Sequence, residues 1–561
     1  GCLLLWLLPF VLRAQASQEV SSRSTLCQQS PMKVSCKGAG LHHLPQELGQ
    51  GVKYLELSNN FIQNLSASSM AGFGQLEYLD MCSNQVEAVS ATTLAQLPQL
   101  HSLLLGSNRL DHNYLVNGQA LHLLRNIEVL DLSANNLESH MAGWYISSLT
   151  RLRVLDLSRN KMTKLSAEFF WSTLRLRELN LSNNYIMEIE EGTLEALEEL
   201  EVVNLALNSL HCMSGFRLRQ LQVLNLSHNA LELFFWEEGV ELYLLQVLDL
   251  SHNRLLSFPE LPKAHHLTHL NLSNNLIASL LPGSHRPGGF ALPYEEMLRL
   301  NRTWHTPTGL SHLTDLDLSH NRLELLPLPF FHSLGSLHSL SLALNCLQEV
   351  ALEPSGHSAA LSVRWLELQA NAIRVLPPWF FSSLPQLEAI NLASNSLQPC
   401  GSQGRDWEGA PGGTCTPFYN IPHLKHLSLS ENNITRLHLY AFNQTSLLSL
   451  DLSGNKDLFM PKEALGGLEL SLQKLSLRDN QMDDSKGELP CLETLKVLDL
   501  SGNNWSFLPT GLLCSPLESL DIRNNNLLRL EQPELLSWAH RLKNISISGN
   551  PFSCCSLAWL D

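Results

Sequence analysis

The segment LQVLDLSHNRL, residues 245–255, determines the fold, because its pattern L-x-x-L-x-L-x-x-N-x-L returns about twenty times along the 561-residue chain with a period of about 24 residues. Other copies are LEYLDMCSNQV at 76–86, IEVLDLSANNL at 127–137 and LTDLDLSHNRL at 313–323. Alternating leucines point from a short strand into a shared core, and the asparagine amide satisfies backbone groups where the chain turns away. The pattern predicts an α/β repeat solenoid, a leucine-rich-repeat horseshoe with a parallel β-sheet on its concave face.

The segments between the strands carry the apolar residues that we expect to close the core from the convex side. Examples are AEFFWSTLRL at 167–176, FFHSLGSLHSL at 330–340 and WFFSSLPQL at 379–387. A solenoid core is open at both ends and needs caps. Cys27 and Cys36 precede the first repeat and predict a disulfide-pinned N-terminal cap, while NPFSCCSLAW at 550–559 predicts the start of a truncated C-terminal cap.

The two ends of the chain predict an exported protein. Residues 1–16 contain an apolar run followed by Ala14-Gln15-Ala16, which is typical of a secretory signal peptide and its cleavage site. Cys554 and Cys555 would need disulfide partners beyond Asp561, so we interpret the chain as a truncated ectodomain whose missing tail could include a membrane anchor.

Two interruptions divide the array into three repeat stretches. The first is too long and too rich in Pro and Gly for one coil, and the second is a Gly-rich loop bracketed by Cys400 and Cys415. If these two cysteines pair, the closed loop has a length for which about 3 kcal/mol of stabilisation is expected. The predicted parts are 1–16 signal peptide, 17–48 N-terminal cap, 49–277 first stretch, 278–312 interruption, 313–398 second stretch, 399–420 disulfide-closed loop, 421–549 third stretch and 550–561 start of the C-terminal cap.

Charge and motifs argue against several function classes. A net charge of −16 without a Lys/Arg run does not fit a nucleic-acid binder. The sequence has no Gly-rich phosphate loop, C-x-x-C pair, H-E-x-x-H or G-x-S-x-G motif, so we expect neither enzymatic activity nor a cofactor or metal site. The pairs His42-His43 and His265-His266 are expected to be surface residues rather than metal ligands.

Two cysteines stand at positions that the other repeats show to face solvent. Cys346 directly follows a repeat asparagine, where other copies hold Arg109, Lys161 or Arg254. Cys212 lies two residues past the last leucine of its copy. Five or six coils separate them, roughly 25 to 30 Å at the spacing of stacked strands, so they cannot form a disulfide with each other.

Unpaired, accessible thiols in an oxidising compartment suggest intermolecular disulfides to a partner. The alternative is that both residues are small apolar side chains partly covered by neighbouring coils. Cys82 is another apparently unpaired thiol, at a strand end. Cys491 and Cys514 lie one coil apart and are candidates for pairing, although connectivity is not readable from sequence.

The strand position between the two inward leucines is often acidic, and we interpret it as a solvated concave surface rather than a cation or basic-ligand site. Asn180, Asn225 and Asn271 place N-x-S sequons at the same position, where a glycan would obstruct the concave wall. Partner binding would then move to the rim and to the loops after the repeat asparagine. The further glycosylation candidates are Asn64, Asn301, Asn433, Asn443, Asn504 and Asn544.

Several segments beyond the generic repeat resemble the family of glycoprotein-A-repetitions-predominant proteins (the GARP family), leucine-rich-repeat receptors for latent transforming growth factor beta. They include KVSC at 33–36, HCMSGF at 211–216, LNCLQEV at 344–350, LGGLELSLQKLSLRDNQM at 465–482 and GNPFSCC at 549–555. The resemblance covers essentially the whole chain and includes, as a close paralogue, the negative regulator of reactive oxygen species.

The resemblance implies a docking mode. A member of this family holds the prodomain dimer of the latent growth factor through two disulfides, one from each of two repeats, and the matching positions here are Cys212 and Cys346. It further implies that the complex is displayed at the cell surface on a single-pass membrane protein with an extracellular N-terminus, where integrins pull on the prodomain and release the active factor. Two readings from other classes stay open: a Toll-like pattern-recognition ectodomain, which predicts no such disulfide, and an extracellular matrix adhesion protein.

Overall fold

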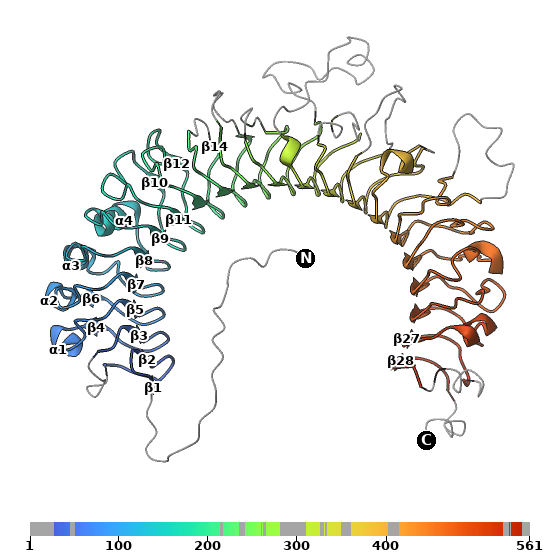
Figure 1. The fold of residues 1–561 in the computed structure, drawn as a ribbon, viewed down its shortest axis with the longest axis horizontal. Coiled ribbons are helices and arrows are strands. Elements are labelled where there is room, and N and C mark those ends of the chain that lie inside the picture. Colours follow the sequence, from blue (N-terminus) through green and yellow to red (C-terminus); the bar gives the residue numbers. More distant parts are fainter. Residues whose placement is uncertain are drawn as a thin grey trace, which may run out of the picture.

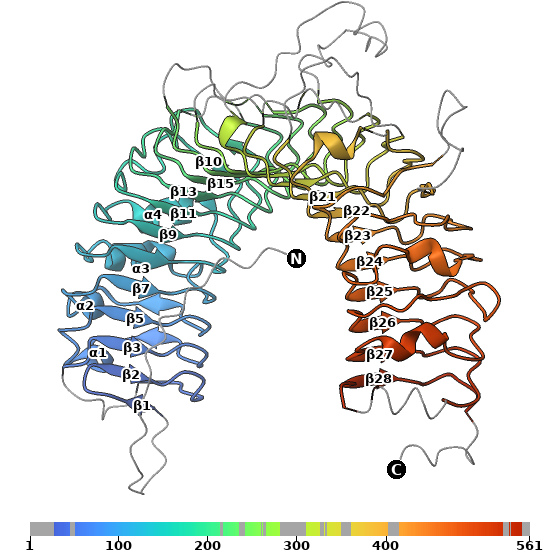
Figure 2. The same ribbon diagram turned by 45° about the vertical axis from the view of Figure 1, so that its right-hand side comes forward.

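The chain forms an arch whose strands line the inner side, as Figures 1 and 2 show in two views of the computed structural model. The predicted leucine-rich-repeat solenoid with a concave parallel sheet is confirmed. The residues that the structure describes are 27–44, 51–213, 217–234, 242–259, 261, 265–280, 310–325, 330, 334–348, 361–377, 379–401, 415–530, 538 and 540–552. The predicted signal peptide, Cys554, Cys555 and Asn301 lie outside these residues.

The concave sheet has 22 strands and runs the length of the arch. Its first strand is antiparallel to the second, and every later pairing between its neighbours is parallel. The strands are β1 (Gln28–Gln29), β2 (Lys33–Ser35), β3 (Tyr54–Glu56), β5 (Tyr78–Asp80), β7 (Ser102–Leu104), β8 (Val129–Asp131), β9 (Val154–Asp156), β11 (Glu178–Asn180), β13 (Val202–Asn204), β15 (Val223–Asn225), β17 (Val247–Asp249), β18 (His269–Asn271), β19 (Asp315–Asp317), β20 (Ser339–Ser341), β21 (Trp365–Glu367), β22 (Ala389–Asn391), β23 (His426–Ser428), β24 (Ser449–Asp451), β25 (Lys474–Ser476), β26 (Val497–Asp499), β27 (Ser519–Asp521) and β28 (Asn544–Ser546).

The sheet is continuous across both predicted interruptions. At the first, β18 pairs with β19 so that Leu270 stands opposite Leu316. At the second, β22 pairs with β23 and Ile390 stands opposite Leu427. The strands on either side of each interruption therefore keep the register of the array.

Short strands and helices lie away from the concave sheet, toward the convex side (Figure 1). The short strands form three parallel pairs, β4 with β6, β10 with β12 and β14 with β16. Their bounds are Asn64–Leu65, Ala88–Val89, Lys164–Leu165, Glu188–Ile189, Cys212–Met213 and Leu233–Phe234. The helices are α1 (Ala67–Met70), α2 (Ala91–Leu94), α3 (Tyr114–Leu121) and α4 (Ser139–Ile146), with 3-10 turns at Leu310–His312, Phe381–Ser383, Lys462–Leu465 and Thr510–Cys514. Within the described part of the chain, no helix combines the length and hydropathy of a membrane span.

The core is a column of leucines between these two sides. In the copy at 245–255, Leu245, Leu248, Leu250 and Leu255 are all essentially inaccessible to solvent. Each buried leucine contributes about 1.5–3 kcal/mol relative to exposure. From the convex side Phe170, Phe330 and Phe380 are buried as the sequence pattern predicts, so aromatic rings close the core opposite the sheet.

A buried asparagine ladder joins each coil to the one before it. The Nδ2 of Asn253 donates to the carbonyl oxygens of Leu226 (2.9 Å) and Leu250 (3.0 Å), and its Oδ1 accepts the N–H of Leu231 at 3.0 Å. Two of these partners belong to the preceding coil and one to its own. The N–H of Leu231 would otherwise be buried without a partner, while each of the two carbonyls also accepts from a second ladder amide, Asn229 at Leu226 and Asn275 at Leu250.

Three disulfides are present in the described part of the chain. Cys27 bonds to Cys36 beneath the first full repeat, so the N-terminal disulfide cap is confirmed. Cys400 bonds to Cys415 across the base of the second interruption, and Cys491 bonds to Cys514 between adjacent coils. These six cysteines are therefore unavailable to a partner.

The prediction for the histidine pairs is wrong at one residue. His42, His43 and His266 are exposed, but His265 is buried, and its Nδ1 accepts the N–H of Leu267 at 3.1 Å while Nε2 has no partner. Burial, reinforced by His266 and His312, lowers the pKa of His265 to about 4. An isolated parallel β-bridge pairs the backbone of His265 with that of Tyr243 on the preceding coil, and the sequence pattern did not reveal this pairing.

The asparagine ladder predicts a large loss of stability from one small deletion. Asn253→Ala leaves the N–H of Leu231 buried without a partner and removes one of two amide donors from the carbonyls of Leu226 and Leu250, so we expect the free energy of unfolding to fall by about 2–4 kcal/mol. Urea unfolding followed by circular dichroism measures this change. Asn526→Ala, at an exposed position directly after a repeat asparagine, is the matched control, and equal losses in the two variants would contradict the account.

Candidate functional site

Cys212 and Cys346 are exposed and unbonded, on two coils in the middle of the arch. Cys212 opens β14, where it stands in register beside Leu233 of β16. Cys346 directly follows the buried Asn345 in the loop after β20, and its backbone N–H donates to the carbonyl of Leu323. The backbone of each thiol is thus fixed by neighbouring coils while its side chain reaches solvent.

The distance between the two thiol-bearing coils follows from the strand order. From β13, on the coil of Cys212, the sheet passes through β15, β17, β18 and β19 to β20, on the coil of Cys346. These five steps correspond to about 24 Å along the sheet at the usual strand spacing. Because a disulfide needs its Cα atoms within about 7 Å, the two thiols are held as separate attachment points. Figure 2 shows these coils as the bend between the two limbs of the arch.

Cys82 differs from the other two free thiols because it is half-buried against carboxylates. Its Sγ lies 3.6 Å from Oδ2 of Asp131, and its backbone N–H donates to Oδ1 of Asp80 at 2.9 Å. Burial raises the pKa of the Cys82 thiol strongly, and the charges of Asp131 and Asp80 raise it further. Since the thiolate is the nucleophile, Cys82 is poorly suited to disulfide exchange at neutral pH.

The acidic strand residues predicted to form a solvated concave surface have a structural role. In eight copies the aspartate Oδ1 accepts the backbone N–H of the residue two positions later, for example Ser251 above Asp249 at 2.9 Å. Glu56 instead accepts a hydrogen bond from Ser35. Among the described residues, no group of three or more His, Cys, Asp or Glu side chains is arranged to hold a metal ion. The full set is Glu56, Asp80, Asp131, Asp156, Asp249, Asp317, Asp451, Asp499 and Asp521.

The three strand sequons follow the same geometry. Oδ1 of Asn180, Asn225 and Asn271 accepts the N–H of the serine two residues later, and all three asparagines are half-buried. Asn180 also donates through Nδ2 to Oδ2 of Asp156 at 2.9 Å. Of the other glycosylation candidates, four are exposed and Asn443 is half-buried; the exposed ones are Asn64, Asn433, Asn504 and Asn544.

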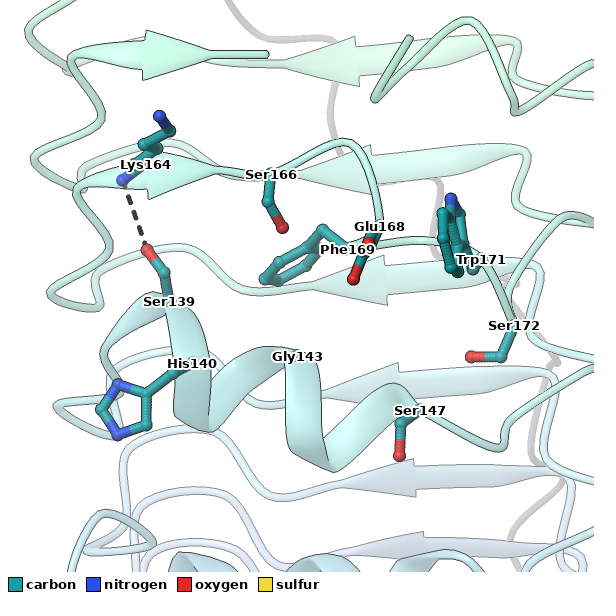
Figure 3. Close-up of a pocket in the computed structure, with 10 residues that line it drawn as sticks. All are labelled: Ser139, His140, Gly143, Ser147, Lys164, Ser166, Glu168, Phe169, Trp171 and Ser172. Carbon is teal, nitrogen blue, oxygen red and sulfur yellow. Dashed lines mark hydrogen bonds between the residues drawn. The ribbon is translucent and has the colours of Figure 1, made fainter.

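A hollow of about 590 Å³ lies on the convex side, between α4 and the coil that follows it (Figure 3). Serines 139, 147, 166 and 172 line it, together with the ring of Phe169 and the indole of Trp171. Lys164 at its edge is paired with Glu190 (2.8 Å) and Glu188 (3.1 Å), and these hydrogen bonds raise the pKa of its ammonium group. Its one lysine is thus held as a paired ammonium group, and Oγ of the lining residue Ser147 lies within hydrogen-bond distance of Nε2 of His122, at 3.0 Å.

The sequence predicted the exposed thiols but not the surroundings of the third. Cys212 and Cys346 were found because equivalent positions in other repeats carry charged residues. The carboxylates around Cys82 come from its own coil and from one two strands away, β5 and β8, and only the strand stacking brings them together. The convex hollow likewise forms between α4 and the next coil, and no single sequence motif contains the residues that line it.

The fold and these thiols define the class of protein: an extended repeat scaffold whose exposed chemistry suits binding. Family models for the leucine-rich repeat match residues 50–110, 125–186, 244–264, 266–286, 312–334 and 420–436. The Toll-like receptor 13 complex with single-stranded RNA has the same fold, with a TM-score of 0.56 and 21% identity over 92% of this chain and 73% of that one.

Two curated relatives place the chain more closely. It is 39% identical to transforming growth factor beta activator LRRC32 of Pongo abelii, over 100% of this chain and 87% of the relative. It is 29% identical to transforming growth factor beta activator LRRC33 of Danio rerio, over 80% of this chain and 70% of the relative. The chain belongs to the family of transforming growth factor beta activator LRRC32, the GARP family that its motifs predicted.

The three free thiols should differ in reactivity. At pH 7.5 we expect iodoacetamide to modify Cys212 and Cys346 at least about tenfold faster than Cys82, because burial and two carboxylates suppress the Cys82 thiolate. Peptide mass spectrometry of the folded ectodomain over time measures the three rates. Modification of Cys82 as fast as Cys212 would contradict the geometry, and a Cys82→Ser variant should retain both fast sites.

Proposed function

We propose that this protein is a cell-surface docking receptor for latent transforming growth factor beta, which it holds through the prodomain dimer. Cys212 and Cys346 each form a disulfide with one of the two prodomain chains, and noncovalent contacts add to them. The bound growth factor is then presented for integrin-dependent activation. The names of the family members as transforming growth factor beta activators support this choice of partner.

The observation that carries the proposal is the placement of two exposed thiols on coils about 24 Å apart in one continuous sheet. A two-fold-symmetric ligand presents the same cysteine twice, at a fixed separation. A single solenoid has no such symmetry, so it must offer two non-equivalent attachment points. Two exposed thiols meet that requirement. Cys212 lies on a short convex-side strand, and Cys346 lies in a loop after the concave sheet.

The covalent step is a thiol–disulfide exchange. The thiolate of Cys212 or Cys346 attacks the prodomain sulfur of a disulfide that the prodomain cysteine makes with another thiol. A new S–S bond forms, the displaced sulfur leaves as a thiolate and takes up a proton, and no net oxidation occurs. Surface complementarity places the ligand first, since exchange requires the two sulfurs to come into contact.

The repeat stretches at 49–277 and 313–398 contribute one thiol each in this scheme, and the stretch at 421–549 extends the scaffold. Because the two bonds join one receptor to both prodomain chains, the stoichiometry is one receptor to one latent dimer.

Removing the thiols should convert covalent docking into reversible docking. We expect Cys212→Ser and Cys346→Ser each to leave one covalent link, and the double variant to leave only a noncovalent complex. Co-expression of the ectodomain with latent transforming growth factor beta, followed by a non-reducing gel, measures this. Cys82→Ser is the matched control and should give the wild-type band.

The wild-type band should be large, collapse on reduction and be absent from the double variant. Free ectodomain alone in the wild-type lane would overturn the docking proposal. A covalent band that survives in the double variant would assign the bond to a different cysteine.

A further inference from the structure

The two coils that carry Cys212 and Cys346 share a local feature. Each repeat has a residue in the left-handed backbone conformation just before its ladder asparagine, and among the described copies this residue is leucine only twice, at Leu207 and Leu344. Both lie in the same tripeptide, Ala-Leu-Asn, at 206–208 and 343–345. The other described copies hold Asn, Ser, Ala, Arg, His, Glu, Asp or Gly there.

Packing does not account for these leucines. Leu207 is 49% exposed and Leu344 is 43% exposed, although both belong to an array in which most leucines are inaccessible to solvent. Their φ angles are +57° and +54°, a region that Asn, Asp and Gly tolerate better than an apolar L-residue. Other coils use better-suited residues at the same position, among them Asn183 and Asn274. An exposed apolar side chain in an unfavourable backbone conformation is an outlier that motivates a functional hypothesis.

Between the two leucines the same position forms a polar row. His228, His252, Asn274 and His320 occupy the four intervening coils, and the rings of His228 and His252 stack with their centroids 3.9 Å apart. Burial and the charges of His228 and His320 lower the pKa of His252, against the opposing effect of Asp249. The row as a whole therefore presents a polar centre with one apolar residue at each end.

We propose that Leu207 and Leu344 are matched apolar anchors, one for each chain of the two-fold-symmetric prodomain dimer, and that they seat the ligand before the disulfides form. This inference rests on the proposed function and specifies its noncovalent step. The two prodomain chains carry the same surface, and Leu207 and Leu344 offer one apolar contact to each chain on the two coils that bear the exposed thiols. Their separation of five coils, about 24 Å, is that of the coils carrying the thiols.

The test uses variants that favour the local backbone. Leu207→Gly and Leu344→Gly introduce the residue that Gly454 and Gly502 already place at this position, so thermal stability should change little. In the Cys212→Ser/Cys346→Ser background, surface plasmon resonance against purified latent transforming growth factor beta reports the noncovalent affinity. We expect each single change to raise Kd about fivefold and both together about 25-fold, mainly through faster dissociation.

The matched control is Ser394→Gly, the same substitution target at the same repeat position, two coils beyond Leu344. It should leave Kd unchanged. A second readout is the rate at which the thiol-intact chain forms its covalent complex, which should slow in Leu207→Gly/Leu344→Gly. Unchanged affinity and an unchanged rate in that double variant would overturn the anchor assignment while leaving covalent docking in place. Failure of the thiol-intact wild-type chain to form any complex would instead overturn the proposed function itself.

Discussion

The asparagine ladder is the interaction on which the rest of the structure depends. An amide such as that of Asn253 bonds backbone groups of its own coil and of the preceding one, so it sets both the turn after each strand and the stacking of successive coils. Replacing it with an apolar side chain would leave one buried N–H unpaired and remove a donor from two buried carbonyls, which no gain in leucine packing offsets. The leucine core makes the array stable, whereas the ladder determines its geometry.

That geometry also explains which residues are free to act. The residue before each ladder asparagine is held in the left-handed conformation, and the residue after it is turned toward solvent, as at Leu344 and Cys346 on either side of Asn345. The parallel sheet keeps the same register from β13 to β20. Each surface side chain therefore has a fixed position along the arch, and the thiols of Cys212 and Cys346 cannot approach each other. The position of Cys82 places its thiol against Asp131 and Asp80, which suppresses its reactivity.

Much of the fold was predictable because the repeats align the protein with itself. The leucine spacing predicted the solenoid, and the cysteines that begin and end CQQSPMKVSC predicted the N-terminal cap. Charged residues at equivalent positions indicated that Cys346 is exposed. Pairing between Cys491 and Cys514 remained only a candidate, since connectivity depends on how the chain runs between coils. The burial of His265 was missed for a related reason: it lies just before a strand, in a segment without the repeat pattern. The carboxylate neighbours of Cys82 come from different coils, and the pattern within a single repeat does not reveal contacts between coils.

The most direct test of the central claim is disulfide mapping of the complex formed with latent transforming growth factor beta. The complex is digested without reduction after alkylation of free thiols, and cross-linked peptides are identified by mass spectrometry. The account predicts that Cys212 and Cys346 each appear joined to the same prodomain cysteine, while Cys82 appears alkylated or as a free thiol. Recovery of Cys212 and Cys346 as alkylated, unlinked peptides from the intact complex would contradict it.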